Sequence, residues 1–206
     1  MTNLATIKLA NGSTIKYDPS KGAGSIAYGP NGQVTLSGWN NASIFGTKSG
    51  NNISVLDSNS VNVFGGRGND NIVFDNCKNS NAFGGKGNDN IVMNNSQYSN
   101  AVGNKGNDNI SVNNSSFSKA FGGRGHDNIE MNGNSYSIAR GGRGPDNISL
   151  NGNAFSRAFG GRGHDSFHSN GNNFFTSAIG GPNHHPIRSF FSHPILSIRL
   201  MLGIRL

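Results

Sequence analysis

The chain has 206 residues, of which 31 are glycine and 33% are apolar, and its formal net charge is +7. Such a composition is typical of disordered or low-complexity proteins. Strict repetition excludes that class, because random polar sequence does not keep Ile, Phe and Asp in register over six copies. The single cysteine, Cys77, excludes an intrachain disulfide and a cysteine-based zinc site. No segment has the roughly 20 apolar residues that span a bilayer, and the N-terminus lacks the apolar run of a secretory signal.

The positive charge is concentrated outside the repeats. Residues 65–179 hold ten Lys and Arg against eight Asp and Glu, whereas the region from Gly180 onward adds Arg188, Arg199 and Arg205 without an acid. The basic pI therefore reflects the ends of the chain, and the sequence does not predict nucleic-acid binding.

The first section, residues 1–26, is predicted to be a β cap. Two short alternating runs, 5–9 and 13–17, are joined through Asn11-Gly12, a pair typical of hairpin turns. Such a hairpin would cover the first open edge of a stacked β structure, which would otherwise invite edge-to-edge pairing.

Residues 27–64 are predicted to form two degenerate coils. They keep the apolar pattern of the later repeats, but Gly32 and Asn51 stand where those repeats have aspartate. We therefore expect coils without a metal site, since terminal repeats are commonly atypical.

Residues 65–179 contain six copies of a 19-residue repeat. Each copy has a glycine-rich turn, a strand that points residues such as Ile72 and Phe74 to one face, an Asn-rich turn, and a second strand such as the one starting at Tyr98. The pattern predicts an all-β fold: a parallel β-solenoid (β-roll) of about eight coils, with a thin core of Ile, Ala and Phe ladders. Such a core is too narrow for a deep pocket.

An aspartate recurs every 19 residues inside the glycine turn: Asp70, Asp89, Asp108, Asp127, Asp146 and Asp165. One carboxylate per coil along one edge suits a hard cation held between coils. It suits catalysis poorly, because every copy is the same, and His126 and His164 occupy a slot that also accepts Asn and Pro. We therefore expect no enzyme activity. The alternative is a plain corner without an ion, in which Asp accepts hydrogen bonds from backbone amides.

The phrase Gly65-Gly-Arg-Gly-Asn-Asp-Asn-Ile-Val resembles the nine-residue RTX (haemolysin-type) calcium-binding repeat, and four other copies match it, whereas Asn104 breaks the second glycine of the copy at Gly103. The resemblance implies a parallel β-roll with Ca²⁺ between adjacent turns. It also implies an extracellular protein exported by a type I system that reads an uncleaved C-terminal signal. Its ligands would be the carboxylates of the six aspartates, the carbonyl of the third residue of each turn, and the carbonyls of the first glycines: Gly65, Gly84, Gly103, Gly122, Gly141 and Gly160.

The motif departs from the RTX pattern because it occurs once in 19 residues, so ions would line one edge only. That arrangement is similar to the calcium-bound ice-binding segment of a large bacterial adhesin, which presents Thr at the third position. This chain has a basic ladder there, which disfavours ice binding: Arg67, Lys86, Lys105, Arg124, Arg143 and Arg162.

The basic ladder has several interpretations. Repulsion between its charges and bound ions predicts a calcium affinity in the weak, extracellular range of about 10⁻⁴–10⁻³ M. In a rival arrangement Arg or Lys pairs with Asp of a neighbouring turn and replaces the ion. The ladder could also bind an anionic polysaccharide, lipopolysaccharide or cell surface, or be a solvated face that keeps the rod soluble.

Residues 180–206 differ sharply in composition, being apolar and basic. An export signal, a cap for the last coil, a membrane-surface segment and an out-of-frame ending all fit this composition. The sequence as a whole predicts a secreted, non-catalytic calcium-binding solenoid. The alternatives are an adhesin rod for anionic glycans and a fragment of a larger RTX toxin or enzyme.

Overall fold

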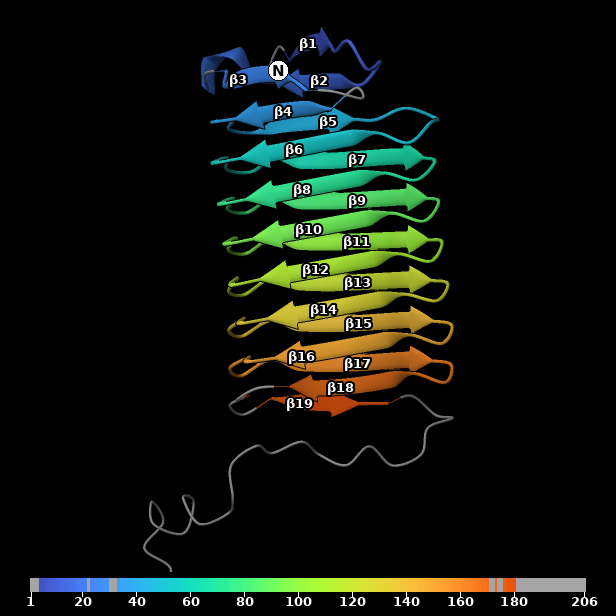
Figure 1. The fold of residues 1–206 in the computed structure, drawn as a ribbon. Helices are drawn as coiled ribbons and strands as arrows, with labels where there is room; N and C mark the ends of the chain where they lie inside the picture. Colours follow the sequence, from blue (N-terminus) through green and yellow to red (C-terminus); the bar gives the residue numbers. More distant parts are fainter. Residues whose placement is uncertain (1–3, 22, 30–32, 171–172, 174–175, 181–206) are drawn as a thin grey trace, which may run out of the picture.

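The computed structural model describes residues 4–21, 23–29, 33–170, 173 and 176–180, and they form a parallel β-solenoid (Figure 1). The predicted all-β class is confirmed, with 2% helix and about seven turns where we expected about eight. Successive coils stack along one axis, and the chain passes once through each of two facing sheets in every coil. No helix in the described part of the chain is long and apolar enough to cross a membrane.

Two sheets make up the solenoid, and a short 3₁₀ helix, η1 (Pro19–Lys21), precedes the coils. The ten-stranded sheet contains β1 (Ala5–Lys8), β2 (Thr14–Tyr17), β5 (Ala42–Phe45), β7 (Asn62–Arg67), β9 (Asn81–Lys86), β11 (Asn100–Lys105), β13 (Lys119–Arg124), β15 (Ile138–Arg143), β17 (Arg157–Arg162) and β19 (Ser177–Ile179). The nine-stranded sheet contains β3 (Ser25–Tyr28), β4 (Val34–Ser37), β6 (Asn52–Leu56), β8 (Asn71–Asp75), β10 (Asn90–Asn94), β12 (Asn109–Asn113), β14 (Asn128–Asn132), β16 (Asn147–Asn151) and β18 (Ser166–Asn170).

The parallel register follows the 19-residue period of the sequence. Ile91 of β10 pairs with Ile72 on one side and Ile110 on the other, and Ala101 of β11 pairs with Ala82 and Ala120 in the same way. Each residue therefore stacks on its own counterpart in the next coil. Rows of equivalent side chains run along the whole rod.

The core lies between the two sheets. The Ile row of the nine-stranded sheet faces the Ala row of the ten-stranded sheet, and residues such as Ile72 and Ala82 are fully buried. The predicted Phe ladder is not in this core. Phe83 follows the buried Ala82 and so points to the opposite face, where its ring stacks on Phe64 at 5.0 Å and leaves Phe64 36% exposed.

The N-terminal cap is the predicted hairpin. β1 pairs antiparallel with β2 across a turn in which Gly12 has φ +86°, and β2 pairs antiparallel with β5. β3 also pairs antiparallel, with β4, so the antiparallel end continues past the boundary predicted at residue 26 to Tyr28. Trp39 closes this end: it is buried, and its Nε1 donates to the carbonyl of Ser25 at 3.0 Å.

The corner that leads into the ten-stranded sheet carries an exposed row of aromatic rings. The second strand was expected to start at Tyr98, but β11 starts at Asn100, and Tyr98 lies in the corner with φ 52°. Phe117 and Tyr136 repeat this left-handed conformation, and their rings stack at 5.1 Å. Ring stacking offsets part of the strain of this conformation, which bulky residues seldom adopt.

Asn104→Gly is predicted to stabilise the solenoid by about 1 kcal/mol, because a residue with Cβ is strained at positive φ. Asn104 has φ 80°, in a slot where Gly85 and Gly123 have φ 119° and 121°. The free energy of unfolding, from urea titration followed by circular dichroism, measures the gain. Asn114→Gly is the matched control: its φ of 49° lies where Asn is well tolerated, so its gain should be smaller. A loss of stability in Asn104→Gly would contradict the argument.

Candidate metal centre: a row of buried aspartates

The structure places the repeat aspartates in one row inside the glycine corner, rather than on its outer surface. Five of them are only 1–2% exposed: Asp70, Asp89, Asp108, Asp127 and Asp146. The sixth, Asp165, continues the row and is half-buried. The carboxylates that the sequence singled out are therefore brought together in register, one per coil, and five of the six have almost no access to water.

Each carboxylate uses one oxygen to join two coils. Oδ1 of Asp89 accepts the backbone N–H of Asp70 at 2.8 Å, and Oδ1 of Asp127 accepts that of Asp108 at 2.9 Å. Oδ1 of Asp165 does the same for Asp146 at 3.0 Å. This is the amide bonding expected of a plain corner, and it fixes the orientation of every carboxylate.

The second oxygen has no such partner. Oδ2 of each of the five buried aspartates is inaccessible to water and accepts no hydrogen bond. Burial raises the pKa of Asp70 to about 6 and the pKa of both Asp108 and Asp146 to about 7, although the donated N–H opposes this shift. Burial also raises the pKa of Asp89 and of Asp127. A row of half-satisfied carboxylates is costly when ionised, so it favours protons or a cation.

The first glycine of each turn makes room for this carboxylate. A Cβ on Gly84, Gly103 or Gly122 would collide with the aspartate of its own turn. The pairing of β7 with β9 passes from Phe64↔Phe83 to Gly66↔Gly85 without a pair at Gly65. The first glycine is thus held beside the carboxylate and out of the regular ladder, and at Gly65 the carbonyl oxygen of the next coil's first glycine lies close as well.

The second and fourth glycines are required by the stacking of the turns themselves. Gly142 has φ 123°, and a Cβ there would collide with the carbonyl oxygen of Gly123 in the preceding coil. The fourth glycine donates its N–H to the carbonyl of the third residue of the next coil, as Gly106 does to Arg124 at 2.9 Å. Five of the third-residue carbonyls, which the RTX resemblance assigned to Ca²⁺, therefore accept one hydrogen bond within the ladder: those of Lys86, Lys105, Arg124, Arg143 and Arg162.

The glycine corner supplies part of the set of oxygen ligands that the RTX resemblance implies for a hard cation. The unpartnered Oδ2 atoms and the carbonyls of the first glycines are oxygen donors of the kind that Ca²⁺ prefers. The described residues contain no cluster of three or more His, Cys, Asp or Glu side chains, so one carboxylate per coil is the charge available. In the degenerate coil, Asn51 replaces Asp, and its Oδ1 accepts the N–H of Thr47 at 2.8 Å. The side-chain oxygen is therefore hydrogen-bonded within its own turn.

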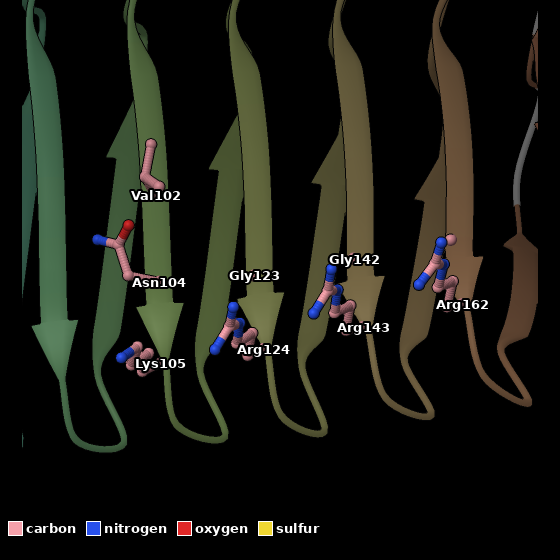
Figure 2. Close-up of a pocket in the computed structure, with 9 residues that line it drawn as sticks. Val102, Asn104, Lys105, Gly123, Arg124, Gly142, Arg143 and Arg162 are labelled. Carbon is pink, nitrogen blue, oxygen red and sulfur yellow. The ribbon is translucent and has the colours of Figure 1, made fainter.

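The basic ladder is separated from the aspartates. Its side chains are exposed at the ends of the strands of the ten-stranded sheet, and Arg124, Arg143 and Arg162 extend side by side in Figure 2. Because Oδ2 of the five buried aspartates has no hydrogen-bond partner, the rival arrangement in which Arg or Lys replaces the ion is wrong for these five. The cations remain available to ligands in solution.

Other cations on the same face escaped the sequence analysis. Lys119, Arg140 and Arg157 occupy outward positions of β13, β15 and β17, and all three are exposed. Alternation within each strand identifies these residues as outward-facing, but it can be applied only when the limits of the strand are known.

Stability in the absence of metal should fall as pH rises. A carboxyl group whose pKa is 3.8 in the unfolded chain and 6 to 7 when folded binds more protons in the folded state between these values. The free energy of unfolding is therefore predicted to decrease from about pH 4 to about pH 7. Urea titrations in chelator at pH 5 and pH 8 test this, and Asp108→Asn/Asp127→Asn should flatten the slope. A protein more stable at pH 8 would refute the assignment.

No family model, no curated protein and no solved structure matches the chain. The likeness of the glycine turns to RTX repeats is therefore a resemblance of short motifs, and the function has to be argued from the site itself.

Proposed function

We propose that the protein is a non-catalytic calcium-binding solenoid of the RTX type. The observation that supports this most directly is the row of five buried Oδ2 atoms without a hydrogen-bond partner. The cation would be held by these oxygens together with the carbonyls of the first glycines, such as Gly103 and Gly122. The carbonyls of the third residues could contribute through their second lone pair, since five of them already accept one ladder hydrogen bond.

A divalent cation would offset the repulsion between the buried carboxylates of the row. Neighbouring carboxylates are about 4.8 Å apart in stacked strands, and their burial opposes ionisation. A cation between coils supplies the missing charge and displaces the protons that the raised pKa values retain. Its proposed role is structural, because the five buried turns offer the same donors, one aspartate and its first glycine, in register.

The expected affinity is weak. One carboxylate per coil is a low charge for a calcium site, and the basic ladder lies at the same corner. We therefore place the dissociation constant in the extracellular range of about 10⁻⁴–10⁻³ M. Such a protein would fold fully in the calcium-rich medium outside a cell, in accord with the secretion that the motif resemblance implies.

Calcium is predicted to stabilise the full chain, and Asp108→Asn/Asp127→Asn to weaken this effect. Asn keeps the Oδ1 acceptor but removes two of the charges that hold the ion. At 100 times the dissociation constant, Ca²⁺ should add about 2.7 kcal/mol to the free energy of unfolding. Urea titration at pH 8, with and without calcium, measures this gain, and titration calorimetry at pH 6 should detect proton release on binding.

The matched control is Asp57→Asn/Glu130→Gln. It also removes two acids, but both are exposed and lie outside the glycine corner. Its calcium response should equal that of the unaltered protein. Equal stability in chelator and in millimolar calcium, with no heat of binding, would rule the proposal out. A calcium response lost equally in both variants would place the ion elsewhere.

A further inference from the structure

The near balance of charge in the repeats conceals a strong separation in space. The repeat aspartates lie inside the corner, whereas the outward positions of β11, β13, β15 and β17 carry cations and no acid. The outer face of the nine-stranded sheet is lined mainly with Asn, with Glu130 among its exposed residues. The basic face, as we call it, contains seven exposed cations: Lys105, Lys119, Arg124, Arg140, Arg143, Arg157 and Arg162.

A shallow groove of about 650 Å³ runs across this face, from one coil to the next. Gly123, Gly142 and Gly161 form its floor, because the second glycine of each turn has no side chain. The basic ladder forms one wall, with Arg124 and Arg143 extended in parallel (Figure 2). At the end nearest β11, Val102 and Asn104 complete the lining, and Val102 is the only apolar side chain among the lining residues.

In the described part of the chain, the exposed positions of β11, β13, β15 and β17 place no acid beside these cations. Asp108, Asp127 and Asp146, each three residues after a cation of the ladder, are buried and bonded to backbone amides. Like charges about 4.8 Å apart repel by roughly 1 kcal/mol even in a water-like dielectric. A row of anions with the same spacing would convert this repulsion into attraction.

We propose that the basic face binds a linear acidic polysaccharide that carries a carboxylate or sulfate on each sugar residue. The coil spacing is close to the length of one sugar residue, so successive charges on an extended chain can meet successive cations. Guanidinium groups form paired hydrogen bonds with carboxylates and sulfates. The glycine floor allows the sugar chain to approach the backbone between the side chains of the basic ladder.

The same face is poorly suited to single-stranded nucleic acid. Such ligands stack their bases on open aromatic faces. Here the guanidinium of Arg140 lies over the ring of Phe159 at 5.1 Å, and Phe45, Phe64 and Phe83 are stacked on one another. The geometry therefore favours a polymer that needs cations and a smooth floor over one that needs free rings.

Binding of the full chain to polygalacturonate, measured by titration calorimetry at low salt, tests the proposal. Arg124→Gln/Arg143→Gln/Arg162→Gln should weaken binding about tenfold or more, since three exposed ion pairs are lost. The variant Arg124→Lys/Arg143→Lys/Arg162→Lys keeps the charges but loses the paired hydrogen bonds, so its affinity should lie between that of the unaltered protein and that of the Gln variant. Binding should also weaken as salt is raised.

The matched control is Lys8→Gln/Lys21→Gln/Lys78→Gln, which removes three exposed charges outside the groove and should leave affinity unchanged. Circular dichroism of every variant checks that the solenoid is formed. No binding by the unaltered protein, or an equal loss in the control, would overturn the proposal. Tighter binding of an oligodeoxynucleotide of equal charge would assign the face to nucleic acid instead.

The titrations are run in calcium and in chelator, so the two proposals fail separately. Polysaccharide binding in chelator, by a protein that ignores calcium, would support the basic face and reject the metal site. A calcium response without polysaccharide binding would do the reverse.

Discussion

Backbone hydrogen bonding between successive glycine turns is the interaction on which the rest of this molecule depends. The fourth glycine of one turn donates to the third residue of the next, and carbonyl oxygens press against glycine Cα atoms that have no side chain. This contact sets the coil spacing at the corner and holds every row in register. The Ile and Ala rows of the core and the Asn rows of the sheet faces follow the same 19-residue register.

The stacking of the glycine turns also separates the acidic from the basic side chains. The first glycine leaves a space that the aspartate side chain fills from inside, and the third residue, at the end of its strand, is left pointing outward. Every repeat but the last, where Asp165 is half-buried, therefore buries an acid and exposes a base within four residues of one another. The two proposed activities arise from this one local geometry: the inner row supplies oxygen atoms for a cation, and the outer row supplies cations for a polyanion.

The sequence could predict the features that depend on period and local turn chemistry. The 19-residue register, the inward Ile72 and Phe74, and the hairpin through Asn11-Gly12 are all found in the structure. The Phe ladder was assigned to the wrong face because alternation identifies two faces without saying which is inside. The buried Ala82 occupies the inward position of β9, and its neighbour Phe83 therefore faces outward. Predictions for residues 181–206 lie outside the described residues.

The inward direction of the carboxylates was beyond sequence reasoning for a different reason. Asp at the sixth position of a turn can point to solvent or to the core, and the choice depends on space beside the first glycine of the same turn. That space exists only after the coils have stacked. The left-handed corner at Tyr98 is a similar case, because aromatic residues disfavour it locally and gain ring stacking only from neighbouring coils.

Strict register has a consequence for how such a chain can evolve. Because each residue contacts its own counterpart one repeat away, the gain or loss of one whole repeat leaves every remaining contact intact. The basic face would then lengthen or shorten by one cation row without any redesign of the groove. The avidity of the basic face for a long polymer depends on how many cation rows bind it at once. The number of repeats alone could therefore tune this avidity.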